Sequence, residues 1–456
     1  MADFTLTTGS PFDDVTGTEE DDLFSGGTLE TQDRIDGAGG FDTLVAAAEQ
    51  NGAQAPTIVS VEDVFVDTGG LLFDVSGISG AERIVADGAS ATFTGIDAED
   101  LDVRFGARGP NVGQVVLDFA DGGIGKTVAV DLEAIGANTT FRAPTSKENR
   151  AVREVDLVLT GDGTPPSEDG DVQVDLSAFG RLETLVLSGE ATSIVQVDSK
   201  KIDLIDAAAT TGGVTVNSDV GNGQRVLGGA GDDDFKTGNG GDVIEAGAGD
   251  DVVNAGGGDN DVALGAGDDT YEGEGGNDAV EGGAGADDIK AGGGNDVLSG
   301  GAGADTIDGE GGEDEIDGGA GDDVLDGGNN DDVIRDGDGN DTVTGGGGED
   351  LIVAGAGDDR FDGGAGNDTF DFVANDDLGD DEVGIGNAFA VGGDTALLLV
   401  GGERYEVRTR DEWRALNEAQ DARVVVDAGA QTVAVDVDNG GTVTFNLSDA
   451  DFFGMA

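Results

Sequence analysis

The chain has 456 residues, of which 97 are Asp or Glu and 22 are Lys or Arg, so its formal net charge is -75. A surface this acidic repels the phosphate backbone of nucleic acids, which excludes them as partners. The absence of cysteine and histidine excludes disulfides, thiolate nucleophiles, and zinc sites or catalytic triads that depend on imidazole. Metal binding must then use carboxylate and carbonyl oxygens, which suit hard cations such as calcium and magnesium.

No segment has the features of a classical export signal or of a membrane span. The first basic residue is Arg34, so the N-terminal stretch lacks the charged region of a signal peptide, and it also lacks the apolar region. The apolar run at 396–400 is far shorter than the roughly 20 residues that cross a bilayer. We therefore predict no transmembrane segment and no export through the classical pathway.

Residues 1–45 contain four short units with a common spacing, which begin at Thr8, Gly17, Thr28 and Gly37. The sixth residue of each unit is an aspartate, and these are Asp13, Asp22, Asp33 and Asp42. The eighth residue is apolar, although Gly26 and Gly27 interrupt the phase. We interpret the region as a short, degenerate version of the regular array at 228–371 and predict that its aspartates bind about two or three metal ions.

Residues 46–227 consist of short alternating runs such as VEDVFV, RIVADG, TVAVDL and VQVDL, which are typical of β-strands. An internal copy is visible, because FDVSGISGAERIVADG at 73–88 aligns without gaps to VDLSAFGRLETLVLSG at 174–189. Strand units that recur at irregular spacing predict a parallel β-helix whose coils vary in size.

An unbroken nine-residue repeat runs from 228 to 371, which is 16 units without an insertion or deletion. Its rule is G-G-x-G-x-D-x-U-x, and the apolar residue U stands at the eighth place in all 16 units. The sixth-place residues are Asp233, Asp242, Asp251, Asn260, Asp269, Asp278, Asp287, Asp296, Asp305, Asp314, Asp323, Asp332, Asp341, Asp350, Asp359 and Asp368. A flexible acidic linker would not keep this phase, so the array predicts a repeat architecture.

The spacing within each unit predicts a flattened coil. Glycines at places two and four allow positive φ and a sharp turn that presents its carbonyl oxygens on one side. The three residues x-U-x are long enough only for a short strand with one side chain toward the core. Two units then form one coil, residues 18 apart stack in register, and the sixth-place aspartates form two columns.

The charge of the array predicts a cation between the coils. The array carries 40 acidic and 4 basic residues, and carboxylates stacked about 5 Å apart repel one another. If each ion bridges two successive turns on one edge, the two columns offer about 14 sites. Folding and metal binding then become one event.

Residues 372–456 lack the nine-residue repeat and contain the strand-like runs TALLLV, RYEVR, ARVVVD, TVAVDV and TVTFNL. Thr409 and Glu412 form a capping box for a helix at 410–420, in which Trp413 and Leu416 lie on one face. We predict a β-rich cap that shields the last edge of the array from pairing with other strands.

The uninterrupted GGxGxDxUx phase resembles the calcium-binding nonapeptide of the RTX (repeats in toxin) proteins, and the looser strand units resemble those of RTX-type bacterial surface-layer proteins. The resemblance implies an all-β fold in which a right-handed parallel β-helix continues into a calcium-bound parallel β-roll. It implies that the sixth-place aspartates and the glycine-turn carbonyls bind calcium. It also implies export by the type I secretion machinery, and the C-terminal sequence SDADFFGMA is compatible with a signal for it.

The expected organisation is a degenerate repeat at 1–45, an irregular β-helix at 46–227, the β-roll at 228–371 and the cap at 372–456. Two residues depart from the repeat. Asn260 keeps an oxygen ligand but removes a charge, so we predict weaker calcium sites beside it. Asn330 replaces the fourth-place glycine, which is a mild change because asparagine tolerates left-handed backbone geometry.

These features predict a non-catalytic, extracellular structural protein: a surface-layer or matrix component that folds on meeting calcium and assembles into a homo-oligomer or lattice. A surface this acidic cannot self-associate until its charge is neutralised. The principal alternative is a calcium-dependent adhesin or glycan-binding module, with a cell-surface polysaccharide as partner, because flat β-helix faces make good recognition surfaces.

A weaker alternative is an enzyme. RTX-linked proteases, lipases and epimerases resemble histidine-dependent enzymes, which this chain cannot be. What remains is a calcium-assisted polysaccharide lyase that uses an arginine as its base. The candidate bases are Arg104, Arg108, Arg142, Arg150 and Arg153.

Overall fold

The computed structural model describes most of the repeat array and the strands on either side of it. The described residues are 2–6, 14–29, 34–48, 57–59, 61, 63–67, 72–74, 78–79, 83–87, 91–96, 104–108, 114–119, 127–135, 139–142, 154–161, 172–176, 181–190, 193–197, 201–218, 221–372, 380–383, 394–400, 403–407, 412, 416, 423–427, 432–436 and 442–446. They form two compact units, 1–238 and 239–456.

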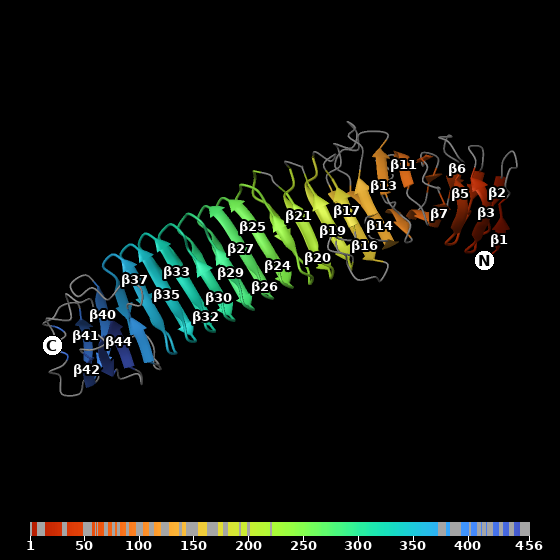
Figure 1. Ribbon diagram of the computed structural model, residues 1–456. Coiled ribbons are helices and arrows are strands. Elements are labelled where there is room, and N and C mark those ends of the chain that lie inside the picture. Colours follow the sequence, from red (N-terminus) through yellow and green to blue (C-terminus); the bar gives the residue numbers. More distant parts are fainter. Residues whose placement is uncertain are drawn as a thin grey trace. The chain divides into compact units, whose positions relative to one another are not determined.

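The first unit is a stack of parallel strands in ladders (Figure 1). One ladder contains β1 (Asp3–Thr5), β3 (Leu23–Leu29), β5 (Thr43–Ala48), β7 (Asp63–Asp67), β10 (Arg83–Asp87), β12 (Arg104–Arg108), β14 (Thr127–Ile135), β16 (Glu154–Gly161), β18 (Thr184–Gly189), β20 (Leu204–Thr210) and β22 (Arg225–Leu227). A second contains β8 (Leu72–Asp74), β11 (Ala91–Ile96), β13 (Gln114–Phe119), β15 (Thr139–Arg142), β17 (Val172–Asp175), β19 (Ser193–Gln196), β21 (Val214–Asn217) and β23 (Asp234–Lys236). A third contains β2 (Asp14–Thr16), β4 (Arg34–Asp36), β6 (Thr57–Val59) and β9 (Ile78–Ser79).

The internal sequence copy occupies equivalent positions in these ladders. Phe73 in β8 and Val174 in β17 belong to the same ladder, and β10 and β18, which follow them, belong to the other. The coils at the start of the chain are 20 residues long, because Asp3 pairs with Leu23 and Leu23 with Thr43. The prediction of a parallel solenoid with coils of variable size is confirmed for this unit.

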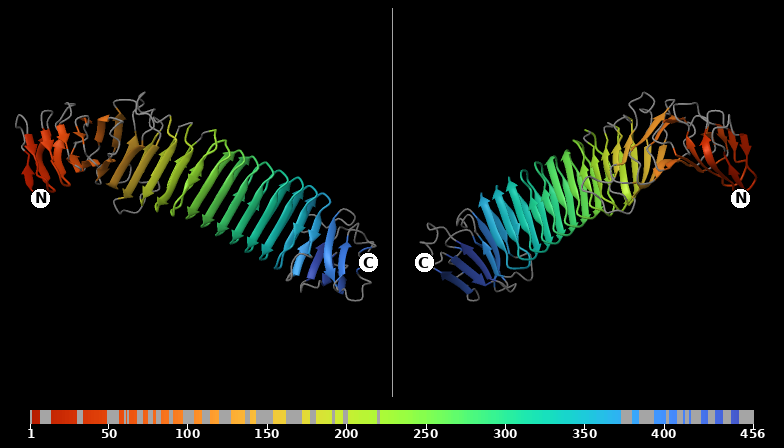
Figure 2. Two further views of the ribbon diagram at one scale, coloured as in Figure 1. Left: turned by 180° about the vertical axis from the view of Figure 1, so that it is seen from behind. Right: turned by 45° about the vertical axis from the view of Figure 1, so that its right-hand side comes forward.

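The second unit contains two ladders of strands, which are stacked in chain order except for the last three strands of the second ladder (Figure 2). One consists of β24 (Val243–Ala248), β26 (Asp261–Ala266), β28 (Ala279–Ala284), β30 (Val297–Ala302), β32 (Glu315–Ala320), β34 (Val333–Asp338), β36 (Leu351–Val353), β38 (Thr369–Asp371), β40 (Thr395–Val400) and β41 (Glu403–Val407). The other consists of β25 (Val252–Gly257), β27 (Thr270–Gly275), β29 (Asp288–Lys290), β31 (Thr306–Asp308), β33 (Val324–Asn329), β35 (Thr342–Gly347), β37 (Arg360–Ala365), β39 (Asp380–Val383), β44 (Thr442–Asn446), β43 (Thr432–Asp436) and β42 (Arg423–Asp427).

The predicted register is confirmed through the repeat part of this unit, where paired residues such as Asp261 and Ala279 are 18 apart. Apolar residues at the eighth place point inward, and each is at most 4% exposed. The prediction of one inward side chain in a three-residue strand is wrong for most of the roll. Strands such as β24 have six residues, and their first-place residues, such as Ala246 and Leu264, are also fully buried.

The cap continues both ladders beyond the last repeat. β40 extends one ladder in parallel and turns back into the antiparallel β41, while β44 and β43 extend the other. Phe372 packs edge-on against Phe361 and against Phe445 of β44, with ring centroids 5.7 and 6.2 Å apart. Of the predicted helix at 410–420 the structure describes Glu412 and Leu416, which are both helical, and Leu416 is buried. Trp413 lies outside the described residues.

Candidate calcium-binding ladder

The sixth-place residues lie in the turns that precede the strands, and all of them are buried. Their side chains are at most 2% exposed, including Asn260 and Asp233, the latter in the first unit. Within the second unit, those that are 18 residues apart lie one coil apart, as predicted, and they form two columns. One column contains Asp242, Asn260, Asp278, Asp296, Asp314, Asp332, Asp350 and Asp368. The other contains Asp251, Asp269, Asp287, Asp305, Asp323, Asp341 and Asp359.

One carboxylate oxygen of each side chain holds two coils together. The backbone N–H of each sixth-place residue donates to Oδ1 of the sixth-place residue one coil further on, at 2.7 to 3.1 Å. The backbone therefore fixes the orientation of every carboxylate in the column. It leaves the second oxygen pointing into the turn.

That second oxygen is the feature that defines the site. Oδ2 is buried and accepts no hydrogen bond in Asp269, Asp287, Asp296, Asp305, Asp314, Asp323, Asp332, Asp341, Asp350 and Asp359. A buried carboxylate oxygen without a donor costs several kcal/mol unless a cation satisfies it. A repeated row of such atoms therefore has the chemistry of a series of cation sites, and oxygen-only donors suit calcium.

The glycine turns beside these carboxylates have the backbone geometry that the repeat predicts. Gly301 and Gly303, at places two and four, have φ of 103° and 145°, which disfavours any side chain. Asn330 also adopts a positive φ, as predicted, but its φ of 81° differs from the 142° of the fourth-place Gly321 one unit before it. Glu310 likewise has a positive φ, of 62°, at a second place, and this was not predicted.

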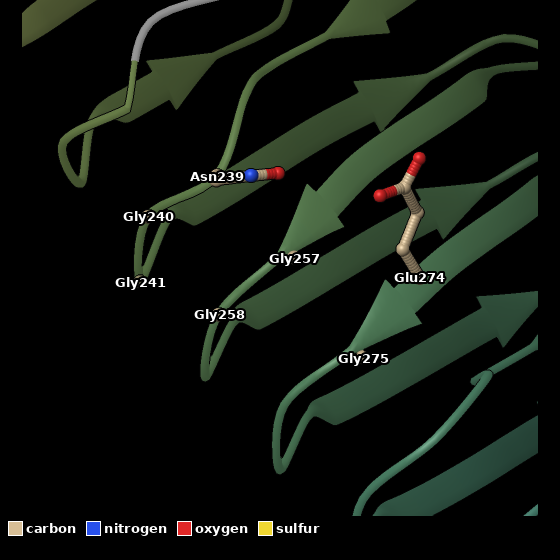
Figure 3. A pocket seen from close by; sticks show the side chains of 7 residues that line it. All are labelled: Asn239, Gly240, Gly241, Gly257, Gly258, Glu274 and Gly275. Atoms are coloured by element: carbon tan, nitrogen blue, oxygen red, sulfur yellow. The ribbon is translucent and has the colours of Figure 1, made fainter.

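Stacked glycine turns leave backbone atoms exposed along the edge of the roll. Figure 3 shows a shallow depression at this edge, lined by the turn residues Asn239, Gly240, Gly241, Gly257, Gly258 and Gly275 together with Glu274. The Gly258 N–H donates to the Gly275 carbonyl at 2.6 Å, and the Gly240 N–H to the Gly257 carbonyl at 2.7 Å. The lining is almost all backbone, with Asn239 and Glu274 as its side chains.

Fifth-place side chains form a second, exposed series of hydrogen bonds between coils, in addition to the buried series of the sixth place. Here the side chain accepts a hydrogen bond from the N–H one coil further on, as Asp268 does from Ala286 and Asn295 does from Glu313. The buried series has the opposite sense, because there the acceptor lies on the later coil. Successive coils are thus connected by side-chain acceptors in both directions.

Burial raises the pKa values of the sixth-place aspartates. The pKa of Asp323 and of Asp332 rises to about 7, and that of Asp287 and Asp296 to about 6, and loss of solvent is the largest cause in each. The N–H donated from the preceding coil opposes the rise, while the carboxylates one coil above and below add to it. These aspartates of the metal-free column therefore hold their protons to higher pH than a free aspartate does, and a bound cation would displace those protons.

The turns around Asn260 differ from the rest of the column. The Tyr271 hydroxyl donates to Asp278 Oδ2 at 2.7 Å, and Tyr271 is itself fully buried at the eighth place. Burial, followed by the charge of Asp278, raises the pKa of Tyr271, so the hydroxyl keeps its proton. A neutral donor thus occupies Oδ2, which accepts no hydrogen bond in ten other sixth-place aspartates of the described roll. It lies beside the unit in which asparagine has already removed one charge.

Three acidic residues of the site were not predicted from the sequence. Asp381 Oδ1 accepts the Asp359 N–H at 3.1 Å, and Asp394 Oδ1 accepts the Asp368 N–H at 3.3 Å, so the cap continues both columns. Asp381 is 1% exposed and Asp394 is 8% exposed. Asp336 is a buried first-place residue near Asp341 and Asp359. No nine-residue phase marks any of the three as a ligand.

The N-terminal region repeats the arrangement at a coil length of 20. The Asp22 N–H donates to Asp42 Oδ1 at 2.7 Å, and the Ala2 N–H donates to Asp22 Oδ1 at 2.7 Å. Asp22 and Asp42 are buried. Asp22 Oδ2 accepts hydrogen bonds from the Thr18 N–H and hydroxyl, unlike most of its counterparts in the roll. Asp13 and Asp33 lie outside the described residues, so their predicted role remains a prediction.

The three arginines considered as lyase bases that the structure describes come from two different ladders. Arg104 and Arg108 stand at the two ends of β12, while Arg142 belongs to β15 in a different ladder. Arg150 and Arg153 lie outside the described residues.

Fold and site together define an all-β parallel solenoid whose repeat array has the donor set of a calcium-binding β-roll. A family model agrees with this class. The model described as the RTX calcium-binding nonapeptide repeat (4 copies) matches residues 227–262, 264–298, 290–325, 299–334, 326–360, 335–370 and 344–378. The array thus consists of RTX repeats, which bind calcium and are typical of secreted proteins exported by type I systems.

No curated protein matches the chain. Among the described residues, no helical segment has both the length and the apolar character that a membrane crossing requires.

Proposed function

We propose that this protein is an extracellular calcium-binding structural protein, a component of a surface layer or matrix that folds and self-assembles on binding calcium after type I secretion. The observation that carries the proposal is the row of buried Oδ2 atoms without hydrogen-bond partners along both columns of the roll. These unpaired oxygens destabilise the folded chain unless cations bind them, so folding depends on the calcium concentration around the protein.

The ion count follows from the columns. Each ion lies between two successive sixth-place residues of one column, with turn carbonyls as further ligands. The array then holds about 14 ions, and Asp381 and Asp394 provide for one more at the end of each column.

The way in which the buried charged groups are distributed along the roll favours a structural role over an enzymatic one. Apart from Asp336, the buried charged groups of the described roll repeat from coil to coil, whereas an enzyme concentrates unlike groups in one place. Because the net charge is -75, copies of the chain repel one another until calcium neutralises them. Calcium therefore controls both folding and assembly in this proposal.

A calcium-dependent adhesin is the second candidate, and exposed apolar side chains on the strand faces favour it. Val252 and Val324 lie in one ladder and are 45% and 49% exposed, and Val297 in the other ladder is 55% exposed. In so acidic a molecule these valines offer apolar contact area to a partner such as a cell-surface polysaccharide. A glycan-array measurement in calcium would detect this activity.

The principal test compares the full chain in excess calcium and in excess chelator. Circular dichroism is expected to show β structure in calcium and its loss in chelator, and electron microscopy is expected to show ordered assemblies only in calcium. β structure that persists in chelator would refute calcium-dependent folding. Monodisperse monomers in calcium would refute the assembly role while leaving calcium binding intact.

A further inference from the structure

One first-place residue of the roll points into the interior of the coil and also lies next to a column of sixth-place carboxylates. Among the first places of the 16 units, only that of the thirteenth unit is charged, and it is Asp336. Most first places are glycine or alanine. The first place faces inward, and Asp336 is 0% exposed.

The backbone explains why this side chain meets the column. A Cβ placed at the first-place residues Gly309 or Gly345 would lie 2.5 Å from Oδ2 of the sixth-place aspartate of the same unit, Asp314 or Asp350. The equivalent partner of Asp336 is Asp341. The first-place neighbours of Asp336 one coil before and after are the small residues Gly318 and Ala354, which leave room for a carboxylate.

Asp336, Asp341 and Asp359 form one buried group. Each offers a carboxylate oxygen, and these oxygens lie within 4.8 Å of one another. Oδ1 of each accepts a backbone N–H, from Gly337, Asp323 and Asp341 respectively, at 2.8 to 2.9 Å. Oδ2 of each is buried and accepts no hydrogen bond. Three buried carboxylates, each with one unpaired oxygen, therefore meet at this turn.

We propose that Asp336 converts this turn into a three-carboxylate calcium site that binds its ion more tightly than the two-carboxylate sites of the same column. The proposal rests on the proposed function, in which the column binds calcium. Two oxygens bound to one calcium at 2.3–2.6 Å are at most about 5 Å apart, so the separations in this group are compatible with one calcium bound by all three carboxylates. Magnesium, with bonds of 2.0–2.1 Å, requires a tighter group.

The charge of the group points in the same direction. An additional carboxylate raises affinity for calcium because ligand charge is one of the two factors that set it, the other being rigidity of the site.

The test measures calcium binding to the full chain by equilibrium dialysis at buffered free calcium. The variants are Asp336→Asn, which removes the charge and keeps the shape, and Asp336→Gly, which restores the commonest first-place residue. The control is Asp338→Asn, because Asp338 is an exposed aspartate of the same unit and its loss changes the net charge equally.

In the wild-type chain and in Asp338→Asn, one ion per chain is expected to bind at about tenfold lower free calcium than it does in both Asp336 variants. Coincident isotherms for wild type and both Asp336 variants would overturn the three-carboxylate site while leaving the calcium column in place. An isotherm of Asp338→Asn that shifts as far as that of Asp336→Asn would overturn it too, since general charge would then explain the effect. No calcium binding by the wild-type chain would instead refute the proposed function.

Discussion

Replacement of Gly303 by alanine is expected to break the stack of turns. Gly303 has φ of 145°, a conformation that an L-residue adopts at a cost of about 1–3 kcal/mol. An added Cβ would also overlap with the carbonyl group of Gly285, which belongs to the turn one coil before. The overlap is with backbone, so no side-chain rotation relieves it.

The structure indicates how much Gly303→Ala destabilises the fold. To remove the overlap, the turn of Gly303 must move away from that of Gly285, which stretches two hydrogen bonds between the coils. These are Gly285 N–H to the Ala302 carbonyl and Asp287 N–H to Asp305 Oδ1, both 2.8 Å long. At about 0.5–1.5 kcal/mol each, their loss adds about 1–3 kcal/mol. With the backbone strain, the total destabilisation is about 2–6 kcal/mol.

Urea unfolding of the full chain in saturating calcium, followed by circular dichroism, measures this loss. Gly347→Ala is the matched control, because Gly347 lies in the same roll, its φ is not positive, and a Cβ there meets no atom within 4 Å. Its unfolding midpoint is expected to stay unchanged or to rise slightly. If Gly303→Ala unfolds at the same midpoint as Gly347→Ala, the inferred steric contact between the turns of Gly285 and Gly303 is wrong.

Three further predictions concern the carboxylates. Asp323→Asn should lower the calcium bound per chain by one or two ions of about 14, whereas Asp322→Asn, at an exposed residue, should not change it. Atomic emission measures the bound calcium, and equal losses in the two variants would contradict the role of the buried oxygen. Tyr271→Phe combined with Asn260→Asp should lower the free calcium at which the weakest ions bind, because it frees Asp278 Oδ2 and restores the missing charge, and an unchanged binding isotherm would refute the explanation of the weak sites. Because the folded-state pKa values of the column reach about 6 to 7, above the usual 3.8, the folded chain binds more protons than the unfolded chain in this range. Stability in chelator should therefore fall as pH rises from about 5 to 7.5, and a β signal that grows over this range would be inconsistent with burial of these groups.

The register of the roll could be predicted from the sequence because its signals are strictly periodic. The 18-residue stacking, the buried eighth place and the two columns all follow from one repeat. The inward first place was missed because glycine and alanine give no apolar signal, and the few larger residues there, Thr237, Leu264 and Asp336, occur without a period.

The end of each column could not be predicted for a different reason. Asp381 and Asp394 lie 22 and 26 residues from the residues they bind, so no fixed offset marks them. Their position depends on how the chain between the last repeat and the cap is routed, which is a tertiary property. In the same way, the hydrogen bond between Tyr271 and Asp278 depends on the depth at which the ring lies in the core, and spacing alone does not reveal that depth.

The two closing aspartates move together with the last repeats. Asp381 closes the column of Asp359, in the last repeat but one, and Asp394 closes that of Asp368, in the last repeat. Because both partners belong to the final coil, removal of repeats further upstream leaves each closing residue with an equivalent partner. Removal of an even number keeps every remaining aspartate in its own column, whereas removal of an odd number joins one column to the other at the deletion. The array can therefore change in length without losing the two sites that end its columns.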